Sequence, residues 1–202
     1  MPSSIHVKHC MFTVTQEIAW SELEARIRQV PLLEPRDGER VYPYATATIT
    51  LQEVRYDQVQ PTSLYALRSH LAFQTQFAAD LAATGHDPLG LTGGLKIAAA
   101  DGTETTLIPP IVEVTPEDGA YILDGLHRTY VGLKAGKAVF TAIHITDIDH
   151  RYPAAAFPNM WSEVVEYDDV PTDPLQKRHY RPNPLTLRRD FSSINGSRPR
   201  TV

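Results

Sequence analysis

The sequence predicts an α+β fold in which packed helices cover a mixed β-sheet. Segments of alternating apolar residues recur at strand length between residues 5 and 145, and a stretch after residue 61 carries apolar residues at helical spacing. Asp101-Gly102, between two strand-like segments, is typical of a hairpin turn. The 202-residue chain is 42% hydrophobic and 21% charged, which is ordinary for one globular domain with appendages.

Residues 1–50 predict an N-terminal strand–helix–strand extension. Ile5 to Val14 alternates and predicts a strand, and Tyr44 to Val54, rich in Thr, Ile and Val, predicts another. Between them a helix is expected to begin at Thr15-Gln16-Glu17, because apolar residues follow at helical spacing: Ile18, Trp20, Leu23, Ile27 and Val30. We expect this extension to widen the sheet or to form a homodimer contact.

Residues 51–165 predict the core unit. A helix is expected from Pro61-Thr62-Ser63, whose hydroxyl groups can cap free N–H groups, to a stop at Gly85. Leu95 to Ala99 and Thr105 to Ile108 form the predicted hairpin strands. Strands at 110–114 and 120–124, a helix from Leu126 to Gly136 and a strand at 138–145 complete the unit.

The segment from Asp124 to Thr129 places an acid, a glycine, a histidine and an arginine where a strand meets a helix. Helix N-termini bind anions through free N–H groups, and arginine makes forked hydrogen bonds to phosphate. Gly125, Arg128 and Thr129 are therefore candidates for phosphate or nucleotide binding, and Asp124 and His127 for catalysis. Structural alternatives stay open: a capping aspartate, a packed histidine, a surface ion pair and a structural hydroxyl.

Glu113 is the candidate metal ligand. Strand alternation places it on the sheet face opposite Val112 and Val114, one strand away from Asp124. There it would either help to hold Mg²⁺ beside phosphate groups or simply face solvent.

The segment of about residues 107–145 contains, in order, Pro109-Pro110-Ile111-Val112-Glu113-Val114, a tight turn at 116–119, the Asp-Gly-x-His-Arg motif and a helix. In the order of these elements it resembles the ParB/sulfiredoxin superfamily. It is most similar to the branch that includes ATP- or ADP-dependent free serine kinases. The resemblance implies a ParB/sulfiredoxin-like mixed sheet, a nucleotide (ATP or ADP) with Mg²⁺, and kinase or nucleotide hydrolase activity. In that chemistry Asp124 would be a general base or a metal-linked carboxylate.

Leu126 departs from the patterns of this superfamily. Sulfiredoxin-like members carry a reactive cysteine at this position, and the kinase branch carries a first histidine there. Because the chemistry of sulfiredoxin needs a thiolate, we do not expect sulfiredoxin activity. The alternative function is a non-catalytic ParB-like module that binds DNA or a protein partner.

Residues 166–202 predict a proline-rich basic C-terminal arm. After residue 170 it carries two acidic residues, Asp173 and Asp190, against seven basic ones: Lys177, Arg178, Arg181, Arg188, Arg189, Arg198 and Arg200. The arm is either a solvated tail or a lid that docks near Asp124 or at a subunit boundary, in which case truncation at Val170 should leave the core folded. The net charge of −5 argues against a dedicated nucleic-acid binder.

The remaining composition predicts a cytoplasmic protein without a membrane partner. A single cysteine, Cys10, excludes an internal disulfide and fits a reducing compartment. No apolar run approaches the ~20 residues that span a bilayer, and the N-terminus lacks the pattern of a secretory signal.

Overall fold

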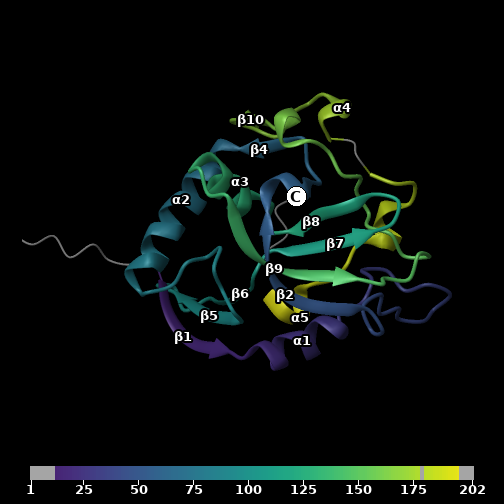
Figure 1. Ribbon diagram of the computed structural model, residues 1–202, viewed down its shortest axis with the longest axis horizontal. Coiled ribbons are helices and arrows are strands. Elements are labelled where there is room, and N and C mark those ends of the chain that lie inside the picture. Colours follow the sequence, from purple (N-terminus) through teal and green to yellow (C-terminus); the bar gives the residue numbers. More distant parts are fainter. Residues whose placement is uncertain (1–11, 178–179, 196–202) are drawn as a thin grey trace, which may run out of the picture.

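A five-stranded mixed sheet forms the centre of the computed structural model, which describes residues 12–177 and 180–195 (Figure 1). The strand order is β2-β9-β7-β8-β3. β2 and β7 pair antiparallel with β9 and β8 respectively, whereas β7–β9 and β3–β8 are parallel. The strands are β2 (Thr48–Arg55), β3 (Gln60–Pro61), β7 (Ile111–Thr115), β8 (Gly119–Asp124) and β9 (Val139–Thr146). With the helices that cover it, this sheet confirms the α+β fold class.

Two smaller sheets flank the central one. The first is antiparallel, in the order β1-β5-β6, and consists of β1 (Phe12–Ile18), β5 (Gly94–Ala99) and β6 (Glu104–Leu107). Its β5–β6 turn holds Gly102 at φ +83°, a conformation that favours glycine, so the predicted hairpin is confirmed. In the second sheet β4 (Tyr65–Leu67) pairs parallel with β10 (Val165–Tyr167).

The helices lie around the central sheet. In Figure 1, α2 and α3 lie side by side at one end of the sheet, and α1 and α5 lie beside β2. The α-helices are α1 (Trp20–Arg28), α2 (Arg68–Ala83), α3 (Leu126–Lys134), α4 (Pro174–Lys177) and α5 (Ser192–Asn195). Three short 3₁₀ helices are η1 (Tyr56–Gln58), η2 (Trp161–Glu163) and η3 (Pro184–Leu187).

Both faces of the central sheet are buried. One face packs against α1 and α5, in a cluster that includes Leu23, Ile27, Ile111, Ile143, Ile145 and Ile194. The other packs against α3 and η2, in a cluster that includes Val54, Val112, Ile122, Phe140, Leu133 and Trp161. A third cluster joins α2 to the β1-β5-β6 sheet through Phe12, Phe77, Leu81, Leu95 and Ile97.

Two predicted helix starts are wrong. Residues 15–18 belong to β1, because β5 pairs with this segment, and α1 begins only at Trp20. The segment after Pro61 is extended and α2 begins at Arg68, because β8 and β10 supply hydrogen-bond partners for this part of the chain. The Thr62 hydroxyl donates to the Ile122 carbonyl at 2.8 Å instead of capping a helix.

The N-terminal strand–helix–strand order is present as β1, α1 and β2. The predicted strand from Ile5 to Val14 falls mostly outside the described residues, as does Cys10. The predicted strand from Tyr44 begins four residues later, at Thr48, and Tyr44 instead buries its side chain. No helix within residues 12–177 and 180–195 is long and apolar enough to span a bilayer.

Candidate functional site

The predicted strand-to-helix junction is present. Asp124 ends β8, Gly125 adopts a left-handed conformation with φ +88°, and Leu126 begins α3. A Cβ atom at Gly125 would lie 2.9 Å from Nη2 of Arg128 and 3.1 Å from Cα of Pro110. The left-handed backbone conformation therefore favours glycine, and the nearby Pro110 backbone leaves little room for a side chain.

A cavity of about 440 Å³ opens beside the junction. This volume lies in the range of about 300–1,000 Å³ that is usual for small-molecule sites. Four of the predicted site residues line the cavity: Asp124, Gly125, His127 and Arg128. The sequence did not reveal the other walls, which come from α2 and the small antiparallel sheet and include Phe73, Gln74, Phe77, Ile97, Thr106 and Leu107.

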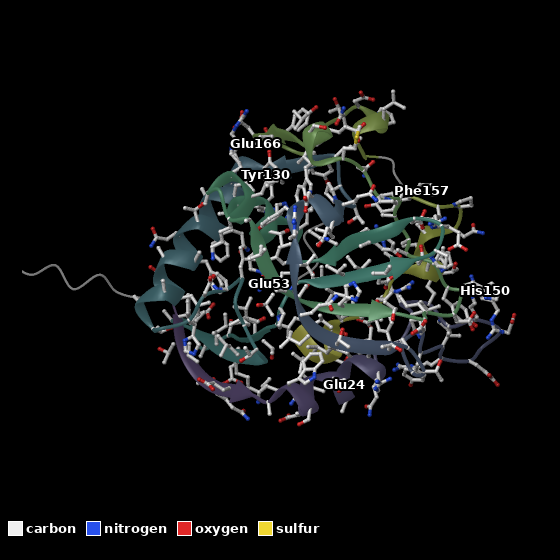
Figure 2. The ribbon with its side chains drawn as sticks, in the orientation of Figure 1. Glu24, Glu53, Tyr130, His150, Phe157 and Glu166 are labelled. Atoms are coloured by element: carbon white, nitrogen blue, oxygen red, sulfur yellow. The ribbon has the colours of Figure 1, made fainter. Side chains whose placement is uncertain are left out.

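α3 is fixed by contacts away from the cavity. The Tyr56 hydroxyl donates to the Thr129 carbonyl at 2.9 Å. Farther along the helix, the Tyr130 hydroxyl lies 3.4 Å from Oε1 of Glu166 in β10, and the two side chains lie close together in Figure 2. Lys134 forms an ion pair with the same carboxylate. These contacts hold the middle and the C-terminal part of α3 against the rest of the fold, while its N-terminus lies at the cavity.

His127 has a partner that sequence spacing could not reveal. The His70 ring, from α2, lies edge-on to the His127 ring with 5.1 Å between centroids. Burial lowers the pKa of His127 and His70 lowers it further, whereas Asp124 acts in the opposite direction. Nε2 of His127 is buried and makes no hydrogen bond within the described part of the chain. The geometry therefore favours a neutral imidazole at pH 7 that can accept a proton.

We expect His127 to titrate below the ordinary histidine pKa of about 6.5. His70→Ala should raise this pKa, because the electrostatic interaction with His70 disfavours the protonated form of His127. His127 binds a proton more readily in the unfolded chain than in the folded one. The neutral side chain therefore makes its full contribution to the free energy of unfolding above about pH 6.5, and this contribution is lost as the pH falls further. Two-dimensional NMR titration of the imidazole resonances measures the His127 pKa in the wild type and in His70→Ala. A His127 pKa at or above 6.5 in the wild type would contradict the expectation.

Thr129 has a structural position. It is fully buried, and its hydroxyl donates within the first turn of α3, with the Leu126 carbonyl at 2.9 Å and the Gly125 carbonyl at 3.2 Å. The structure therefore supports the structural alternative for the Thr129 hydroxyl, which is satisfied within the helix and has no exposed surface.

Glu113 lies in a buried network on the α1/α5 face of the sheet. Arg189 donates to its carboxylate through Nε, 2.9 Å from Oε1, and Nη2, 3.1 Å from Oε2. The Tyr121 hydroxyl donates to Oε2 at 2.8 Å, and the Tyr44 hydroxyl donates to Oε1. Burial, together with the charge of Glu113, raises the pKa of both tyrosines, which therefore stay protonated as donors.

This network corrects both expectations for Glu113. Its side chain is 0% exposed, so it does not face solvent. Both carboxylate oxygens already accept hydrogen bonds, so it is not placed to hold Mg²⁺ beside Asp124. Within residues 12–177 and 180–195, no group of three or more His, Cys, Asp or Glu side chains is arranged to hold a metal ion.

The C-terminal arm docks on the body, but away from the cavity. Arg181 pairs with Asp118 in the β7–β8 turn, and Arg189 pairs with Glu113. None of the arm's described residues lines the cavity at Asp124. The interpretation of the arm as a lid near Asp124 is therefore wrong for its described part, because these two arginines meet carboxylates elsewhere. Residues 178–179 and 196–202, with Arg178, Arg198 and Arg200, lie outside the description.

The structure thus defines an α+β protein with an Asp-Gly-x-His-Arg junction beside a cavity. Residues 22–165 match the family model of the ParB CE domain, and the chain belongs to that family. No match is found among curated proteins or among solved structures.

Proposed function

We propose that the chain binds a nucleotide or another phosphorylated small molecule in the cavity beside α3. One observation carries the proposal: Asp124, Gly125, His127 and Arg128 line the same cavity, at the N-terminus of a nine-residue helix. The first N–H groups of a helix have no partner within it, and the helix dipole adds partial positive charge. Phosphate groups would lie against these N–H groups and the Arg128 guanidinium.

The same residues support phosphoryl transfer. In the reaction that we propose, an acceptor oxygen forms a bond to the terminal phosphorus while the bond to the bridging oxygen breaks, and the acceptor's proton passes to a base. Asp124 and the neutral His127 are the candidate bases. The acceptor is a small-molecule hydroxyl in a kinase and water in a hydrolase. Catalysis would depend on positioning and on charge stabilisation by Arg128 and the helix N-terminus.

Mg²⁺ fits this site only as an ion shared with the ligand. Mg²⁺ is commonly held by one or two carboxylates together with substrate phosphates. Asp124 is the carboxylate that could contribute here, since Glu113 is engaged by Arg189. The ion would neutralise charge on the phosphate oxygens.

Calorimetric titration of the full chain tests the proposal. ATP, ADP, CTP, GTP and inorganic tripolyphosphate would each be titrated with and without Mg²⁺. We expect at least one nucleotide to bind, and Mg²⁺ to strengthen binding. If the wild type binds none of these ligands, the proposal is wrong. Phosphate release and transfer to small hydroxyl compounds, followed by ³¹P NMR, then separate a hydrolase from a kinase.

The alternative is a non-catalytic module whose basic arm binds DNA. Arg181 and Arg189 are engaged by Asp118 and Glu113, and Arg189 is only 1% exposed. Neither guanidinium can contact a phosphate backbone without giving up a carboxylate partner. A gel shift at low salt, with Arg128→Ala beside the wild type, tests this alternative. DNA binding without any nucleotide binding would favour it.

A further inference from the structure

An exposed aromatic side chain lies at the cavity. Phe73, on α2, keeps 53% of its surface exposed and lines the cavity that contains Asp124 and Arg128. Single exposed hydrophobic residues are ordinary on protein surfaces. Phe73 differs from such residues because it lines the same cavity as Arg128 and the N-terminus of α3.

Phe73 is the outer member of an aromatic series. Its ring is stacked on Phe77, with 6.0 Å between centroids and 20° between planes, and Phe77 packs on Phe12 at 4.8 Å. Phe12 and Phe77 are buried in the core cluster below α2. The core therefore holds Phe73 from one side and leaves a large part of its surface open to a ligand.

The lining of the cavity combines polar and apolar side chains. Asp124, His127 and Arg128 supply charge and hydrogen-bonding groups, whereas Phe73, Phe77, Ile97 and Leu107 supply apolar surface. Gln74, next to Phe73, also lines the cavity and can both donate and accept hydrogen bonds. A phosphorylated sugar or acid would use the polar groups and leave the aromatic surface uncovered. A nucleotide would use both kinds of surface.

We propose that the ligand is a nucleotide whose base stacks on Phe73 and faces the Gln74 amide, while its phosphates lie at the Asp124–Arg128 junction. This inference rests on the proposed function and makes it more specific: the aromatic base, in addition to the phosphates, contributes to binding. Base–aromatic stacking in proteins is sequence-tolerant, because every base has a π-face.

Calorimetry with a matched pair of ligands tests the role of Phe73. Inorganic tripolyphosphate carries the phosphate chain of a nucleoside triphosphate without the nucleoside. We expect Phe73→Ala to weaken binding of ATP, CTP or GTP about 5- to 150-fold and to leave tripolyphosphate binding unchanged. Phe73→Tyr should bind as the wild type does, because it keeps a stacking ring. Met160→Ala is the control, since Met160 is 59% exposed and does not line this cavity.

Tryptophan fluorescence supplies a second measurement. In Phe73→Trp, nucleotides should quench emission beyond the change in the wild type, which has two tryptophans, whereas tripolyphosphate should not. Unchanged nucleotide affinity in Phe73→Ala would overturn the inference and leave the phosphate site standing. Equal weakening of nucleotide and tripolyphosphate would also overturn it. If the wild type binds neither class of ligand, the proposed function itself fails.

Discussion

Replacing Arg189 with alanine should lower the free energy of unfolding by about 3–5 kcal/mol, the cost that is usual when one partner of a buried ion pair is removed. Arg189 and Glu113 are 1% and 0% exposed, so water cannot replace the lost guanidinium without opening the core. The same change removes hydrogen bonds to the Pro153, Leu187 and Tyr152 carbonyls. Urea denaturation of the full chain measures the effect.

Two controls isolate the buried pair. Arg55→Ala removes a surface partner of Asp57, with both side chains 62% exposed, and should leave the unfolding midpoint nearly unchanged. The double variant Glu113→Leu/Arg189→Met should be more stable than Arg189→Ala, because an apolar pair leaves no buried charge. An Arg189→Ala protein with the midpoint of the Arg55→Ala control would contradict the expectation.

The Arg189 result also bears on truncation of the chain. Ending the chain at Val170 removes Arg189 together with three apolar side chains of the core: Leu187, Phe191 and Ile194. We therefore expect the truncated protein to be less stable than Arg189→Ala. The sequence-based expectation that the core stays folded without the arm is at odds with this burial.

Replacing Arg128 with alanine should weaken nucleotide and tripolyphosphate binding about 10- to 150-fold, from the loss of charge-assisted hydrogen bonds worth about 1.5–3 kcal/mol. Arg128 lines the cavity, and its guanidinium lies over Gly125 at the N-terminus of α3. Arg128→Lys should recover only part of the affinity, because a lysine keeps the charge but not the forked geometry. Calorimetry with Mg²⁺ present measures all three proteins.

Arg68→Ala is the matched control for Arg128. Arg68 begins α2, pairs with Asp168 at 2.9 Å and is 53% exposed, so its loss should leave affinity unchanged. Because Arg128 is buried, thermal unfolding should accompany each titration to show that the variants are folded. If a folded Arg128→Ala protein binds nucleotide and tripolyphosphate with wild-type affinity, Arg128 does not contribute to ligand binding.

Elements with local determinants could be predicted from the sequence. The Asp101-Gly102 hairpin, the strands on either side of residues 116–119 and the helix after Gly125 lie where turn residues and periodicity indicate. The prediction failed where distant strands decide the conformation. Residues 15–18 and the segment after Pro61 are extended because β5, β8 and β10 pair with them, and no local pattern reveals such partners.

The candidate site also has residues that the sequence predicted and residues that only the structure revealed. By itself the sequence determined the junction of Asp124, Gly125, His127 and Arg128, because five consecutive residues at a strand-to-helix turn stay together in any fold that keeps the turn. Only the tertiary structure places His70 and Phe73 of α2 beside that junction. It also shows that Glu113 does not line the same cavity. Glu113 is paired with a residue 76 positions away, and this pairing depends on how the C-terminal segment covers the sheet. Local turn chemistry is encoded in neighbouring residues, whereas burial and charge pairing depend on which distant surfaces exclude water together.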